Sequence, residues 1–129
     1  MSYVKYNVNP KGRKVGDCAI RAVAVATGLG WDEAYKQLSS AGFYYKCAMN
    51  DIEAVDIVLK DNGFKVGTIK VQKGEKRPTV SEFARNTPEW YCVLRVANHL
   101  VASGRGNYVD IWDCGDKSVY KYWYKEIQK

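Results

Sequence analysis

The hydrophobic period of this chain changes from helical to mainly strand-like at Gly63, and that change limits the possible folds most. Before Gly63, apolar residues recur at helical spacing; after it, short runs alternate with the two-residue period of strands. Helices followed by strands predict an α+β fold rather than alternating βα units. With 129 residues, 47% of them hydrophobic, and no repeat or linker, we expect one domain spanning residues 1–129.

Each helical segment has a candidate N-cap and a glycine stop. The three expected helices are 18–27 after Asp17 and before Gly28, a second from Trp31, capped by Asp32, to Gly42, and a third from near Asn50 to Gly63. In the third, Asn50 and Glu53 have the N-cap and N3 spacing of a capping box. The first sixteen residues read as an extended loop.

The second half of the chain reads as an antiparallel sheet onto which the helices pack. The expected strands are 64–69, 90–97, 99–103, 108–112 and 119–124, with a short helix at 79–85 after the first. Residues 104–107, Gly-Arg-Gly-Asn, have the composition of a hairpin turn. Strands 99–103 and 108–112 are therefore expected to pair.

Three residues with catalytic chemistry fall at informative places. Cys18 opens a helix, the only histidine, His99, opens a strand, and Asp113 closes the next strand. An unperturbed thiol has a pKa of about 8.5, and a helix N-terminus or a nearby imidazolium favours the reactive thiolate. Asp113 could orient the imidazole as the third member of a triad. Asp110, in the middle of the expected strand, is the weaker candidate for that role.

Each of these residues also has a structural interpretation. A cysteine in an alanine-rich helix can be a small buried hydrophobe, and a histidine between strands can be a satisfied structural residue. Asp113 precedes Cys114-Gly115-Asp116 and could simply form a turn. The combination of all three in these contexts favours catalysis.

The chain resembles the papain-like (clan CA) cysteine peptidases in a minimal form. The resemblance rests on Gly-Asp-Cys-x-x-Arg-Ala at 16–22 and on the pair of strands from His99 to Asp113; it extends to small papain-like proteins of phages and bacterial mobile elements. It implies a papain-like fold and a thiol-dependent peptidase or isopeptidase. Cys18 would be the nucleophile, His99 the base and Asp113 its orienting residue. No metal or organic cofactor would be required.

The oxyanion site departs from the family pattern. Papain-type enzymes usually carry a glutamine six residues before the cysteine, and Gly12 stands there in this chain. The remaining donors would be the backbone N–H of Cys18 and an upstream side chain, with Asn9 the first choice and Asn7 the second. Losing one oxyanion donor typically costs on the order of 100-fold in rate.

Two other functions stay open. A papain-like scaffold could serve as a catalytically silent binding or inhibitor module on a host or partner protein. The excess of 20 Lys and Arg over 14 Asp and Glu, a net charge of +6, also allows a basic nucleic-acid-binding domain, although the charges are scattered. The hydrolase remains the leading hypothesis, with a peptide or protein substrate and an undetermined oligomeric state.

The expected location is the cytoplasm, with the host cytoplasm implied if a phage encodes the chain. The N-terminus has no apolar run that would form a signal peptide, and the longest apolar stretch is too short to cross a bilayer. The four cysteines lack the paired spacing of zinc sites and would remain thiols in a reducing compartment.

Overall fold

The computed structural model describes residues 3–128, which form four helices and one six-stranded mixed sheet. The helices are α1 (Cys18–Thr27), α2 (Trp31–Tyr45), α3 (Ile52–Asp61) and α4 (Val80–Asn86). The strands are β1 (Tyr3–Lys5), β2 (Lys65–Thr68), β3 (Trp90–Val96), β4 (His99–Gly104), β5 (Asn107–Asp110) and β6 (Lys121–Glu126). Their order in the sheet is β1-β5-β4-β3-β6-β2. The prediction of an α+β chain is confirmed.

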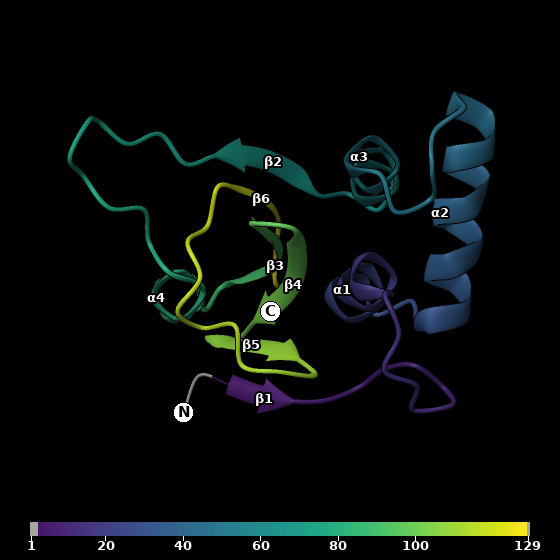
Figure 1. Cartoon of the computed structure of the whole chain (residues 1–129), viewed down its shortest axis with the longest axis horizontal. Helices are drawn as coiled ribbons and strands as arrows, with labels where there is room; N and C mark the ends of the chain where they lie inside the picture. Colours follow the sequence, from purple (N-terminus) through teal and green to yellow (C-terminus); the bar gives the residue numbers. More distant parts are fainter. Residues whose placement is uncertain (1–2, 129) are drawn as a thin grey trace.

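The curled sheet lies between α1, α2 and α3 on one side and α4 on the other (Figure 1). Successive side chains of a strand point to opposite faces of the sheet, and both faces are packed. Val93 of β3 packs in the core beneath the first three helices, and Leu94 packs in the core beneath α4. The helix-side core contains the fully buried Trp123, whose indole nitrogen donates to Asp56 of α3 at 2.8 Å. Two separate cores thus fix the sheet from both faces.

A two-residue turn joins β4 to β5 and sets their register. Gly104 pairs with Asn107, and the two residues between them, Arg105 and Gly106, have φ angles of 54° and 86°. Positive φ at both central positions is the geometry of a type I′ turn, which suits the twist of a hairpin. The turn expected at 104–107 is confirmed. The register that it imposes determines which side chains reach His99.

The sequence predicted an antiparallel sheet, but one pair of strands in the structure is parallel. Residues 3–5, expected to lie in a loop, form β1 and pair in parallel with β5 at the sheet edge. These three residues carry no strong alternating pattern because their side chains are half-buried or exposed, so backbone pairing alone defines the strand.

Two expected helix caps are also corrected. The N-cap of α3 is Asp51, whose carboxylate accepts from the Glu53 amide at 2.9 Å, so Asn50 lies outside the helix. The N-cap of α2 is Gly30, and Asp32 falls within the first helical turn. There a carboxylate still interacts favourably with the helix dipole, although it makes no capping hydrogen bond.

Gly42 does not end α2, which continues to Tyr45. The helix stops at Lys46, which adopts the left-handed conformation with φ 61°. Gly42 is a glycine for a packing reason, because a Cβ there would lie 2.7 Å from the carbonyl oxygen of Cys47 and 3.1 Å from the Met49 backbone. The sequence pattern that predicted a glycine stop at Gly42 therefore reflects a close contact with the backbone of Cys47 and Met49.

Gly42→Ala should destabilise the protein, although alanine normally favours a helix interior by about 1 kcal/mol over glycine. The added Cβ must displace backbone, and overpacking of this kind costs about 1–3 kcal/mol. We expect the free energy of unfolding to fall by about 1 kcal/mol in urea titrations. Ser40→Ala, two residues earlier in the same helix, is the matched control; a Gly42→Ala protein more stable than wild type would contradict the packing argument.

Candidate active site

The ends of three elements meet beside the sheet. Cys18 is the first residue of α1, His99 the first residue of β4, and Asp110 the last residue of β5. Helix α1 packs along β4 and also touches β5, which brings the helix N-terminus to the strand ends. Residues far apart in the sequence are thereby positioned by regular elements with packed cores on both sides.

His99 is held by a carboxylate from the neighbouring strand. Its Nε2 lies 2.5 Å from Oδ2 of Asp110, and the two side chains are only 11% and 4% exposed. The Trp112 ring lies against the imidazole, with 5.0 Å between ring centroids. Burial alone would lower the pKa of His99, but hydrogen bonding to Asp110, Cys114 and Cys18 outweighs it and raises the pKa to about 11. The imidazolium is therefore the favoured form at neutral pH.

The half-buried Cys18 thiol is the partner of this imidazolium. Hydrogen bonding to His99 lowers the pKa of Cys18 below its ordinary value, and the Leu100 backbone adds to this against the opposing effect of burial. Because Nε2 of His99 lies against Asp110, Nδ1 is the ring nitrogen that this carboxylate does not contact. The lowered pKa of Cys18 and the raised pKa of His99 both favour the thiolate–imidazolium form of the pair.

Asp113 does not take the orienting position that the sequence analysis gave it. Its Oδ1 accepts from the Tyr108 hydroxyl at 2.5 Å and from the Gly115 amide at 2.9 Å. Strand β5 ends at Asp110, before the expected end at 112. Extending the Ala102–Val109 register by one residue places Asp110 beside Val101, on the face that His99 also occupies. Counting register from the hairpin turn would have identified Asp110.

A buried ionic network extends behind the site. Arg21 of α1 forms ion pairs with Asp17 and, at 3.4 Å, with Oδ1 of Asp110. Asp17 also accepts from Asn9 at 3.1 Å and from the Trp31 indole at 2.9 Å. The Asp17 side chain makes no capping hydrogen bond to α1, contrary to expectation. The first amide groups of α1 are consequently left without a side-chain cap at the end where Cys18 lies.

The side chain expected to complete the oxyanion site lies elsewhere. The Asn9 amide is buried and donates to Asp17, while the Asn7 amide donates to the Arg13 carbonyl at 2.9 Å. Neither residue lines the hollow beside Cys18. Asn50, which the capping pattern had assigned to a helix start, lies there instead. The position of Asn50 beside Cys18 could not be predicted from the sequence, because it depends on how α3 packs against α1.

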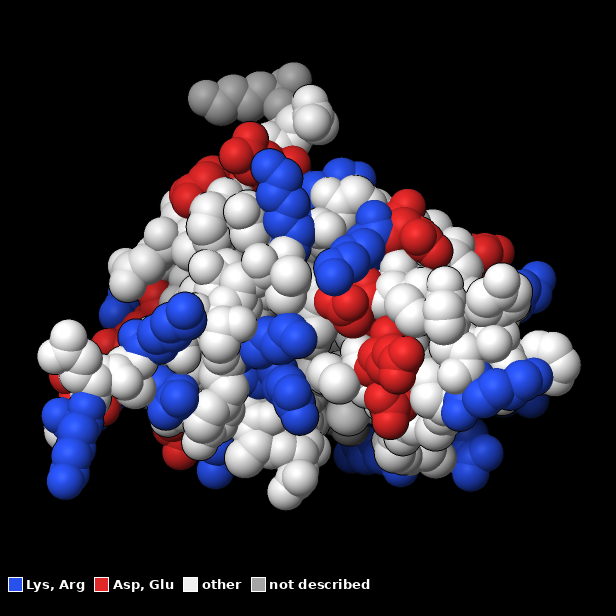
Figure 2. All heavy atoms as spheres, turned by 90° about the horizontal axis from the view of Figure 1, so that it is seen from above, with Lys and Arg blue, Asp and Glu red and all other residues white. Residues whose placement is uncertain are grey.

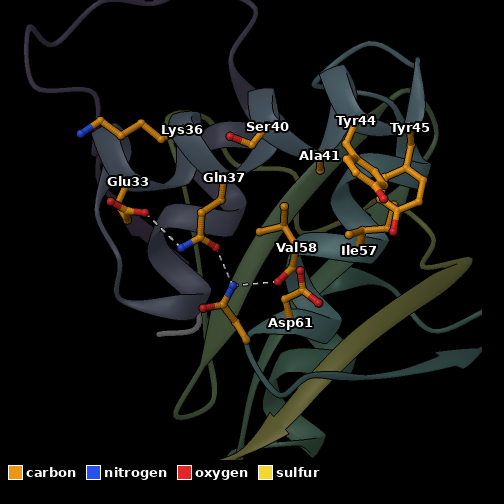
Figure 3. A pocket seen from close by; sticks show the side chains of 11 residues that line it. Glu33, Lys36, Gln37, Ser40, Ala41, Tyr44, Tyr45, Ile57, Val58 and Asp61 are labelled. Carbon is orange, nitrogen blue, oxygen red and sulfur yellow. Dashed lines mark hydrogen bonds between the residues drawn. The ribbon is translucent and has the colours of Figure 1, made fainter.

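The hollow beside Cys18 is a cleft of about 250 Å³ between the N-terminal ends of α1 and α3 and the β3–β4 turn. The lining residues, called here the thiol cleft, are Gly16, Cys18, Ala19, Asn50, Ile52, Arg95, Val96, Asn98, His99 and Leu100. Both Cys18 and His99 line it. A wider hollow of about 650 Å³ between α2 and α3 shares none of these residues; hydrogen bonds link Glu33, Gln37 and Asn62 along it (Figure 3).

A second thiol, Cys114, adjoins the site and was not singled out from the sequence. It is fully buried, and its sulfur lies 3.8 Å from Oδ2 of Asp110. Burial raises the pKa of Cys114, opposite in direction to the shift at Cys18. His99, Asp110 and Cys114 offer ligand atoms within 4.8 Å of one another. The 2.5 Å between His99 and Asp110 is a hydrogen-bond distance, shorter than the roughly 3.3 Å between neighbouring ligands of tetrahedral zinc.

No family model, curated protein or solved structure matches this chain. The interpretation of the site consequently rests on its own geometry.

Two further observations concern membrane-spanning helices and the surface charge. Over residues 3–128, no helix combines the length and hydrophobicity needed to span a bilayer. On the face shown in Figure 2, basic and acidic side chains are interspersed rather than separated into blocks of one sign.

Proposed function

We propose that this protein is a thiol-dependent hydrolase of papain-like arrangement that acts on a peptide or isopeptide bond. The observation that carries the proposal is the relay from Asp110 through His99 to a thiol at a helix N-terminus. Cys18 would be the nucleophile, His99 the general acid and base, and Asp110 the positioning residue that holds the imidazole. In this proposal Asp110 replaces Asp113 in the orienting role.

Acylation would begin with the Cys18 thiolate attacking the substrate carbonyl carbon. The oxygen that becomes negative would lie near the uncapped amides at the start of α1, which provide partial positive charge. His99, protonated before the attack, would give its proton to the leaving amine as the C–N bond breaks. The products of this half-reaction are a free amine and a thioester on Cys18.

Deacylation would require His99 as a base. Once Cys18 is a thioester, the hydrogen bond between His99 and the sulfur, which helps to raise the pKa of His99, is lost. The imidazole is then neutral, because it has given one proton to the leaving amine. It can take a proton from water, which attacks the thioester and restores the free thiol with release of a carboxylic acid. Asp110 would stabilise the imidazolium that is present before acylation and forms again during deacylation.

The small cleft favours a restricted substrate, such as a flexible terminus or loop of one partner protein, over general digestion. We place the activity in a reducing compartment, the cytoplasm, because all four cysteines are free and Cys18 must stay reduced to react.

The test is the rate at which iodoacetamide alkylates Cys18 from pH 4 to 10, with the labelled site assigned by mass spectrometry. Wild-type protein should react well below pH 8, because the pKa of Cys18 is lowered, and the reactivity should disappear only as the pH falls through that pKa. His99→Ala should move the midpoint to about 8.5, the value of an ordinary thiol.

The other cysteines provide internal references in the same experiment. Cys92 is buried with its pKa raised to about 12, and burial also raises the pKa of Cys47. Labelling of Cys18 that begins only near pH 8.5 and does not change in His99→Ala would reject the ion pair. That outcome would favour a silent binding module on the same scaffold.

A further inference from the structure

Arg95 of β3 lines the thiol cleft. It lies on β3 directly opposite Leu100 of β4, and facing residues of an antiparallel pair share one side of a sheet. Leu100 packs in the core beneath α1–α3 and also lines the cleft, as does Arg95. The Arg95 side chain is exposed, and Arg95 lines the same cleft as Cys18 and His99.

The charge of Arg95 is not neutralised from within the cleft. The four ion pairs found over residues 3–128 do not include Arg95, and none of the residues that line the cleft carries a carboxylate. The neighbouring cation on the next strand differs: Lys121 lies over the Trp123 ring and near the Asp56 carboxylate. The Arg95 guanidinium is thus free to pair with an acidic group of a bound molecule.

The rest of the cleft suits a short acidic side chain. The half-buried Ile52 offers apolar surface for methylene groups, and the Asn50 and Asn98 amides can donate hydrogen bonds. The volume of about 250 Å³ is below the roughly 300–1,000 Å³ of typical small-molecule sites, so it suits one side chain. A guanidinium binds a carboxylate through two parallel hydrogen bonds.

We infer that the thiol cleft is a subsite for a glutamate or aspartate side chain of the substrate, held by Arg95 close to the bond that Cys18 attacks. This inference rests on the proposed hydrolase function and adds the substrate class to it. An acidic residue near the scissile bond would bind with its carboxylate on Arg95 and its carbonyl carbon presented to the thiolate.

The test uses acetylated peptide vinyl sulfones that carry glutamate, glutamine or lysine at the first or second residue before the reactive group. The rate of Cys18 modification is measured for each probe. At the better position, wild-type protein should react with the glutamate probe roughly tenfold faster than with the isosteric glutamine probe, since a charge-assisted bidentate pair forms. Arg95→Glu should reverse the order and favour the lysine probe.

Arg85→Glu is the matched control, because it makes the same charge change at an exposed arginine of α4, beyond the other face of the sheet. It should leave the preference for glutamate intact. Equal rates for the glutamate and glutamine probes, with rapid iodoacetamide labelling of Cys18, would overturn the acidic subsite and leave the hydrolase proposal standing.

A failed hydrolase proposal would give a different pattern. If iodoacetamide labelling of Cys18 is slow and independent of His99, binding of the plain glutamate and glutamine peptides to Cys18→Ser protein decides the subsite alone. Glutamate-selective binding that Arg95→Glu abolishes would support the acidic subsite in a protein without turnover. Equal binding of the two peptides would overturn it together with the enzyme.

Discussion

Asp110→Asn should lower the rate of Cys18 alkylation at pH 6 by about 100-fold, because most of the thiol would then be protonated. The Asp110 oxygens are surrounded by donors: His99 at 2.5 Å, the Ile111 amide at 2.8 Å and Arg21 at 3.4 Å. An asparagine removes the negative charge that stabilises the imidazolium and turns an N–H group toward one of these donors. The pKa of His99 should fall and that of Cys18 should rise toward its ordinary value.

Asp113→Asn is the matched control, since it makes the same chemical change three residues away. The exposed Asp113 carboxylate bonds Tyr108 and Gly115, so its loss should change the alkylation rate at pH 6 by less than about twofold. Circular dichroism of both variants would verify that they fold. A large loss in Asp113→Asn with none in Asp110→Asn would restore the assignment made from the sequence.

The contrast between these two aspartates shows where sequence reasoning stops. The helix at Cys18, the strand at His99 and the turn after Gly104 each follow from local patterns of apolar residues, caps and glycines, and all three are present. The orienting residue depends on where β5 ends and on its register with β4, which are relations between segments. Because the strand end was expected two residues too late, the sequence analysis placed Asp113, rather than Asp110, beside His99.

The same limit applies to Asp17 and Asn9. Aspartate is a common N-cap residue, but the Asp17 oxygens bind Arg21, one turn along α1, and the indole of Trp31, fourteen residues away, instead of the first amides of the helix. Asn9 was predicted to be an oxyanion donor from its position in the chain before Cys18, but its side-chain amide donates to Asp17. Short-range spacing predicts which groups are polar and near a helix start, whereas tertiary packing decides what each one binds.

The Arg21 network should be the largest single polar contribution to stability in this fold. Arg21 is 8% exposed and bridges Asp17 and Asp110, each 4% exposed. Arg21→Met removes the cation and leaves Asp17 buried with only neutral donors, Asn9 and Trp31. Breaking a buried ion pair by removing one partner costs about 3–5 kcal/mol, and we expect the free energy of unfolding at pH 7 to fall by that amount in urea titrations.

The pH dependence gives a second readout with a definite sign. Burial alone would raise the pKa of Asp17, but hydrogen bonds from Trp31 and Asn9, together with Arg21, lower it below its ordinary value. A carboxyl with a lowered pKa stabilises the fold above its unfolded pKa of about 3.9, and that contribution is lost as the pH falls through the folded pKa. In Arg21→Met, this acid-dependent loss should become smaller, because part of the stabilisation of the carboxylate is already gone.

Lys60→Met is the control for removing a cation from an ion pair. Lys60 pairs with Asp56 at 3.0 Å, but its side chain is 53% exposed, and exposed pairs contribute about 0–1 kcal/mol. Its unfolding free energy should therefore stay within about 1 kcal/mol of the wild-type value. If Arg21→Met were equally mild, the buried cation could not be holding Asp17 and Asp110 in place. His99 would then depend for its orientation on the β4–β5 register alone.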